Sequence, residues 1–106
     1  MTDDLARQQR FLLEVEQGIR LANREVLHNK IPPINSESVL SFAVAVAKVR
    51  AEYLEFAFAF TEKQKAEPIT EIEINELQKY RKTYEEARAA FDALKHAIEV
   101  GYIDLA

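Results

Sequence analysis

The sequence contains no cysteine and no tryptophan, and its 106 residues include only two glycines and three prolines. Without cysteine the chain can form neither disulfides nor thiolate metal sites, and it has no thiol nucleophile. Few glycines and prolines leave few positions for turns, so the elements of secondary structure must be long. A chain without cysteine fits a cytoplasmic protein, which is the location that we expect.

The sequence also lacks an excess of positive charge and a long uncharged apolar run. Its 14 Lys and Arg residues against 18 Asp and Glu residues give a net charge of −4. Nucleic-acid binding usually leaves a basic footprint, so this balance argues against it. The most apolar stretch, residues 38–60, is interrupted by Lys48, Arg50, Glu52 and Glu55. We therefore expect no membrane span, which needs about 18 or more apolar residues, and the acidic N-terminus is unlike a secretory signal.

Apolar residues recur every three or four positions through three long stretches of the chain. This period predicts helices over residues 3–30, 36–65 and 70–100. Pro32-Pro33 and Glu67-Pro68 separate the three stretches, because proline cannot continue a helix and also constrains the residue before it.

Local end signals support the third helix. Thr70-Glu71-Ile72-Glu73 matches a capping box, and Gly101 stands where a left-handed helix terminator belongs. The connections between the predicted helices are short, so neighbouring helices should run antiparallel. The predicted fold is all-α: one domain over residues 1–106, built as an antiparallel three-helix bundle of long helices. The pattern leaves open whether the tail 102–106 packs on its own chain or on a neighbour.

The helix over residues 36–65 carries two apolar seams. The first is Val39, Phe42, Val46, Val49, Tyr53, Phe56 and Phe60, and the second is Leu40, Val44, Ala47, Ala51, Leu54 and Phe58. At about 100° per residue the seam centres lie roughly 150° apart. A helix that is apolar on nearly opposite sides must be covered on both sides.

The other two helices can cover one broad side of this helix, which leaves the second seam for another surface. Ala43, Ala47 and Ala51 are small residues at four-residue spacing, which lets two helices approach closely. We expect a homodimer in which the helix packs against its own copy across a two-fold axis. A dimer, a higher oligomer and an unidentified protein partner all remain open. The alternative is that the other two helices wrap the central helix fully, with the tail filling the gap.

Three tyrosines fall at one level of the bundle. If the helices over 36–65 and 70–100 are antiparallel about Glu67, Tyr53 lies at the height of Tyr80 and Tyr84. Buried phenols need hydrogen-bond partners, so the three could line a small polar ligand pocket with Glu16 or Arg20 of the first helix nearby. The alternative is that the rings pack in the core and the hydroxyls reach its rim.

Two histidines fall near one end of the bundle. Glu25 and His28 form a Glu-x-x-His pair, and Asp92 and His96 are one turn apart. Such pairs ligate metals in carboxylate-bridged helical bundles. Those sites need inward carboxylates from several helices, so surface histidines near helix C-termini are the competing interpretation, and we expect no metal and no cofactor.

Catalytic motifs are missing. Ser36, Ser38 and Ser41 are the only serines, without a histidine–carboxylate pair in reach, and no glycine-rich phosphate loop occurs. The three long helices resemble spectrin-type repeats, but the tryptophan that marks those repeats is absent, and the same absence excludes the Trp-x-Gly helical hairpins.

We therefore expect a protein that is not an enzyme and acts as a homo-oligomeric interaction or adaptor module. Its contact residues would be Leu40, Ala43, Val44, Ala47, Ala51, Leu54 and Phe58. One alternative is a helical bundle that binds a small molecule or metal at the tyrosines or at the His28/His96 end. Another is an accessory regulator associated with a DNA-binding partner.

Overall fold

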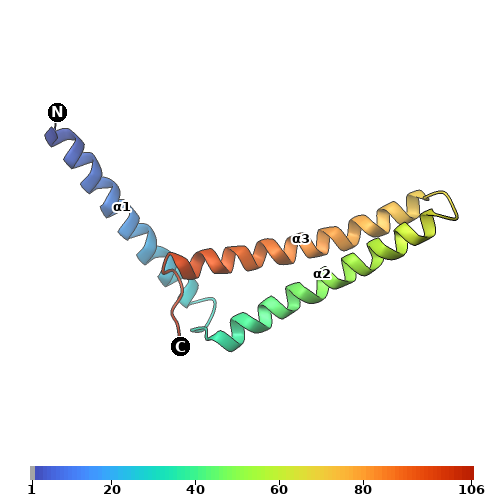
Figure 1. Cartoon of the computed structure of the whole chain (residues 1–106). Helices are drawn as coiled ribbons and strands as arrows, with labels where there is room; N and C mark the ends of the chain where they lie inside the picture. The colour runs from blue at the N-terminus through green and yellow to red at the C-terminus, as the bar shows by residue number, and fades with distance from the viewer. Residues whose placement is uncertain (1) are drawn as a thin grey trace. The chain divides into compact units, whose positions relative to one another are not determined.

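The computed structural model describes residues 2–106 and contains three long helices (Figure 1). Helix α1 spans Thr2–His28, α2 spans Ser36–Gln64 and α3 spans Glu71–Glu99. The structure is 81% helical and has no strand within these residues. The predicted all-α fold with three long helices is therefore confirmed, and each helix begins and ends within two residues of its predicted bounds, as expected for frayed helix ends.

The ends of α3 form as the sequence predicts. The backbone amide of Glu73 donates to Thr70 Oγ1 at 3.2 Å, and the Thr70 hydroxyl donates to Glu73 Oε1 at 2.9 Å. At the other end, Gly101 adopts a φ of 77°. The Gly101 amide donates to Ile98 O at 3.1 Å and the Tyr102 amide to Ala97 O at 2.8 Å. These two bonds are the Schellman pattern, which needs a residue that tolerates the left-handed conformation.

The chain divides into two compact units. One unit contains the chain up to Asn35 together with Lys95–Ala106, and the other contains Ser36–Leu94. Helix α1 and the C-terminal tail belong to the first unit, whereas α2 and most of α3 form the second.

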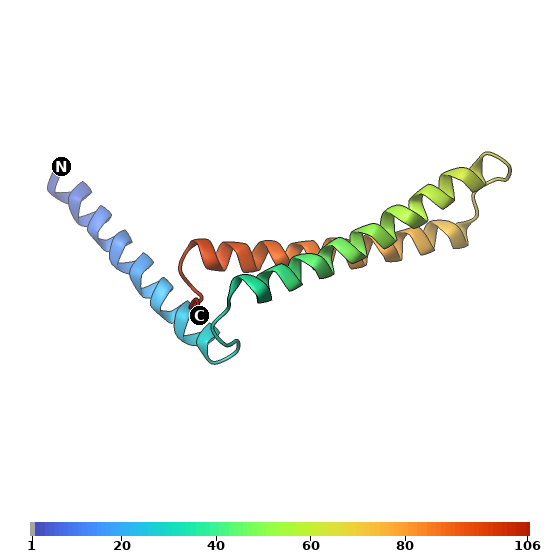
Figure 2. The same ribbon diagram turned by 60° about the horizontal axis from the view of Figure 1, so that its bottom comes forward.

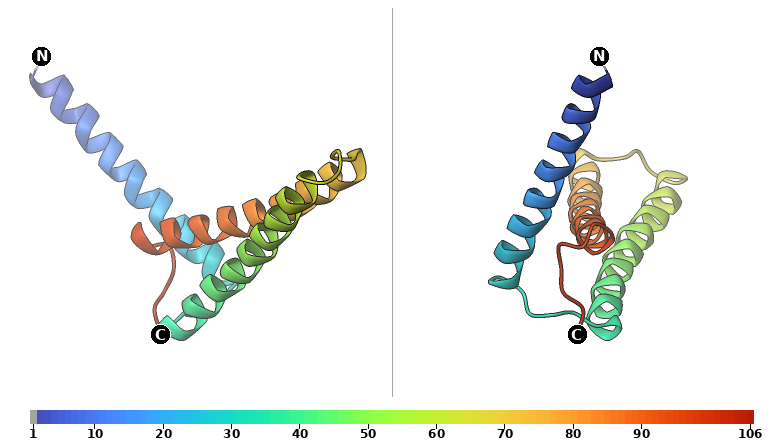
Figure 3. Two further views of the ribbon diagram at one scale, coloured as in Figure 1. Left: turned by 45° about the vertical axis from the view of Figure 1, so that its right-hand side comes forward. Right: turned by 90° about the vertical axis from the view of Figure 1, so that its left-hand side faces the viewer.

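The second unit is an antiparallel pair of helices. Helices α2 and α3 lie side by side in Figure 1, Figure 2 and both views of Figure 3. Three ring pairs join them, with centroids 5.6 Å apart for Phe42–Phe91, 6.0 Å for Tyr53–Tyr84 and 5.0 Å for Phe56–Tyr80. From one ring pair to the next, the residue numbers on α2 increase while those on α3 decrease. The predicted antiparallel register about Glu67 is therefore confirmed.

In the first unit, the tail packs on its own chain. The Ile34 amide donates to Asp104 O at 3.0 Å and the Ala106 amide donates to Ile34 O at 2.8 Å, which forms an isolated parallel bridge between Ile34 and Leu105. Arg24 Nη2 lies 2.5 Å from Asp104 Oδ1, and His28 Nδ1 lies 3.5 Å from Asp104 Oδ2. These contacts tie the tail to the last turns of α1.

None of the helices within residues 2–106 is long and apolar enough to cross a membrane.

Candidate interaction surface on helix α2

One side of α2 is covered by α3. We call this side the inner seam: Val39, Phe42, Val46, Val49, Tyr53, Phe56 and Phe60. Val46 is only 5% exposed and is the one buried apolar residue of the described chain. Phe42 is at the margin with 36% exposure, and the remaining inner-seam residues are half-buried. The inner seam therefore forms the contact that holds the two helices together.

The other apolar side of α2 is not covered by α3. We call it the outer seam: Leu40, Val44, Ala47, Ala51, Leu54 and Phe58, with Ala43 beside it. Its large side chains are 64% exposed at Leu40, 45% at Val44, 47% at Leu54 and 72% at Phe58. Ala47 and Ala51 are exposed as well, and Ala43 is half-buried. Six apolar positions in a row on one exposed helix face are unusual, since scattered apolar residues are the norm at a surface.

The outer seam contains no charged residue, and the arginine beside it faces α3. Arg50 Nε donates to the Tyr84 hydroxyl at 3.2 Å, and its guanidinium carbon lies 5.3 Å from the centre of the Tyr84 ring. Arg88 approaches the same ring at 5.7 Å. The hydrogen bond from Arg50 lowers the pKa of Tyr84 below its ordinary value, opposed by burial and aided by the charges of Arg50 and Arg88. Arg50 is thus held by its own hairpin.

The three tyrosines lie at the level that the sequence predicts, but their rings belong to two separate stacked pairs. Tyr53 stacks on Tyr84, whereas Tyr80 stacks on Phe56. Tyr80 lines a shallow hollow of about 220 Å³ with Val49, Glu52, Glu76, Lys79 and Thr83. The ring faces are therefore largely occupied by other rings and by arginine, and a ligand at this level stays a prediction.

The histidines have partners in the tail. His28 lies by Asp104, and the His96 ring meets the edge of Tyr102 with centroids 6.4 Å apart. Glu25 and Asp92 are exposed, one turn before His28 and His96 respectively. Within residues 2–106, no three or more His, Cys, Asp or Glu residues are grouped so that they could hold a metal. The pairing of His28 with Asp104 could not be read from the sequence, because 76 residues separate the two positions.

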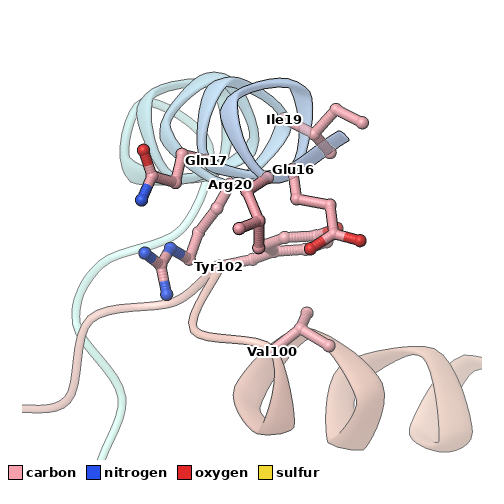
Figure 4. Close-up of a pocket in the computed structure, with 7 residues that line it drawn as sticks. Glu16, Gln17, Ile19, Arg20, Val100 and Tyr102 are labelled. Atoms are coloured by element: carbon pink, nitrogen blue, oxygen red, sulfur yellow. The ribbon is translucent and has the colours of Figure 1, made fainter. Parts of the chain in front are cut away.

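A hollow of about 460 Å³ lies in the first unit, between α1 and the start of the tail. Figure 4 shows Tyr102 below α1, with Glu16 and Arg20 reaching down beside its ring. Leu13, Gln17, Ile19 and Val100 complete the lining. Glu16 and Arg20, which sequence reasoning placed near Tyr53, Tyr80 and Tyr84, thus lie beside Tyr102, the tyrosine that it did not consider for a site.

No protein-family model, no curated protein and no solved structure matches this chain. The function must therefore be argued from the residues themselves.

Proposed function

We propose that this protein is a homo-oligomeric interaction module whose contact surface is the outer seam of α2. The observation that carries the proposal is the exposure of this seam: four large apolar side chains and two alanines form a continuous uncharged stripe, while the opposite side of the same helix is packed. Apolar stripes of this kind mark association surfaces on soluble proteins.

The energetic argument favours a copy of the same chain as the partner. In a two-fold dimer every seam residue contributes twice, because the same patch occurs on both subunits. Covering eight half-exposed large side chains at about 1 kcal/mol or more each gives on the order of 10 kcal/mol before costs. This gain is comparable to the 4–15 kcal/mol that association is estimated to cost. The outer seam alone therefore roughly offsets the cost of association, and a micromolar dimer, which needs a net of about −8 kcal/mol, also requires contacts beside the seam.

The role that we propose is structural or adaptor-like, with apolar complementarity as its mechanism. Dimerisation through α2 uses only the outer seam and leaves α1 unused. Helix α1 has exposed apolar residues of its own, including Phe11, Leu12 and Leu21, at 64%, 58% and 66%. These side chains are the candidate contacts for a further protein.

Size-exclusion chromatography with light scattering on the full chain tests the proposal. We expect a dimer at micromolar concentration, and we expect Ala47→Glu to be a folded monomer, because it places a carboxylate in the centre of the seam on each subunit. Ala89→Glu is the matched control: Ala89 is an exposed alanine of α3 outside the seam, so this variant should remain dimeric. A monomeric parent protein, or an Ala47→Glu variant that still dimerises, would overturn the proposal.

A further inference from the structure

We infer that the two copies of α2 pack antiparallel, with the two-fold axis on the outer face of the helix, between Ala47 and Ala51 and at the level of residue 49. This inference rests on the proposed function and specifies how the second copy is seated. It starts from the spacing of the outer seam. The intervals between its six residues are four, three, four, three and four, and this series is the same in both directions along the helix.

The outer seam therefore has the same residue spacing when the helix is read from either end. An antiparallel copy centred beside residue 49 places Leu40 opposite Phe58 of the second copy, and Val44 opposite Leu54. Ala47 then meets Ala51 of the second copy. The sizes match as well as the spacing: the residues are large at both ends of the seam and small on both sides of its centre. A surface that a two-fold rotation maps onto itself is the requirement for an isologous dimer.

Side-chain volume favours the antiparallel arrangement over the parallel one. In a parallel pair each residue meets itself, so one end of the interface would hold two phenylalanines and the other two leucines. In the antiparallel pair both ends hold one leucine and one phenylalanine, and the layers are equally filled about the centre. Equal filling keeps the two helices at one separation along the seam, as close packing requires.

The position of Arg50 removes one electrostatic argument for the parallel form. A parallel coiled coil would be supported by an ion pair between Arg50 and Glu55 of the second copy, which flank the seam on opposite sides. Arg50 is instead hydrogen-bonded to the Tyr84 hydroxyl and lies over its ring within its own subunit. The one pair of opposite charges that would favour the parallel form is therefore already disengaged.

Chain connectivity adds a steric reason. Phe42 contacts Phe91, so the start of α2 and the residues before Leu94 lie at the same end of the hairpin. The first unit is joined to the hairpin at that end, through Asn35–Ser36 and Leu94–Lys95. A parallel dimer would bring all the connections to the two first units to one end of the interface. The antiparallel dimer divides these connections between the two ends.

Cysteine cross-linking tests the arrangement, and the absence of native cysteine makes the introduced thiols the only ones present. Ala47→Cys and Ala51→Cys are prepared as separate full-length variants, mixed under reducing conditions and then oxidised. A disulfide requires Cα atoms within about 7 Å. We expect the mixture to form a covalent dimer that contains one chain of each variant. Each variant alone should cross-link at least tenfold less, because residue 47 faces residue 51 and not itself.

Glu52→Cys is the control for random collision, since Glu52 is an exposed residue of α2 that belongs to neither seam; it should not cross-link. Efficient cross-linking of Ala47→Cys or Ala51→Cys alone would overturn the antiparallel arrangement about residue 49 while leaving the proposed dimer intact. A chain that light scattering shows to be monomeric, with no cross-link in any mixture, would overturn the dimer itself. A dimer under reducing conditions that yields no cross-link would show that the contact lies elsewhere, and would overturn both.

Discussion

The two seams of α2 have similar composition and different surroundings. Both are apolar and both follow the same three-four spacing, yet Val46 on the inner seam is 5% exposed whereas Val44, two residues away on the outer seam, is 45% exposed. The inner seam has α3 as its partner within the hairpin, and the outer seam has no partner there. Helical periodicity therefore identifies which apolar faces must be buried, whereas long-range packing decides which element buries each face. Within the hairpin, packing covers the inner seam and leaves the outer seam exposed.

The largest expected effect comes from placing the same charge on each seam in turn. Val46→Asp removes a buried side chain and forces a carboxylate into the α2–α3 contact, which should cost on the order of 4 kcal/mol. We expect the hairpin to unfold, with loss of helical circular dichroism. Val44→Asp should leave the helices intact and abolish the dimer. If both variants unfold to the same extent, the two seams belong to one core and the distinction between them is wrong.

The next effect concerns the aromatic end of the outer seam. Phe58 is 72% exposed. In the antiparallel dimer the Phe58 rings of the two copies are covered at opposite ends of the interface. Phe58→Ser should therefore raise the dissociation constant by about 100-fold, from the loss of two rings at about 1–2 kcal/mol each. Sedimentation across a concentration series measures it. Ile72→Ser is the matched control, because Ile72 is equally exposed, at 75%, but lies on α3; its dissociation constant should be unchanged.

A smaller effect tests whether the inner contact can be weakened without disturbing the outer one. Thr70 caps α3, and Glu73 joins this cap to Lys63 of α2, whose Nζ lies 3.2 Å from Glu73 Oε1. Thr70→Ala should lower the free energy of unfolding by about 1 kcal/mol. The dissociation constant of the dimer should not change, because the cap lies beyond the outer seam. If Thr70→Ala also raises the dissociation constant of the dimer, the α2–α3 contact and the dimer contact are coupled.

The same cap predicts a pH dependence of the inner contact. The hydrogen bond from Thr70, followed by that from Lys63, lowers the pKa of Glu73 below its ordinary value. A lowered pKa in the folded state means that folding favours the ionised carboxylate. Its contribution is complete above the unfolded-state pKa of about 4.3 and is lost as the pH falls through the lowered value. Denaturation of the parent protein and Glu73→Gln at pH 7 and pH 3 should show a smaller difference in stability at pH 3 than at pH 7.

Most of the fold and both seams of α2 can be predicted from the sequence because they depend on local rules. The cap at Thr70, the terminator at Gly101 and the two seams of α2 each follow from residues within a few turns of one another. The level at which Tyr53 meets Tyr84 follows from the turn between the helices. The ion pairs of Arg24 and His28 with Asp104, and the position of Tyr102 beside Glu16 and Arg20, do not, because no local pattern specifies how a short tail returns to a distant helix.

The smallest expected effect distinguishes the two orientations of the outer seam by charge. In the antiparallel arrangement Lys48 of each copy lies next to the two-fold axis, so the two ammonium groups repel each other weakly across it. In the parallel arrangement Lys48 faces Ala43 of the second copy, and no such repulsion arises. Lys48→Gln should therefore tighten the dimer by about two- to fivefold at low ionic strength, the range of an exposed charge pair. The gain should vanish at about 0.5 M salt, where screening extends over only a few ångströms. An affinity that is indifferent to Lys48→Gln at low salt would count against the antiparallel seating of α2, whatever the strength of the dimer.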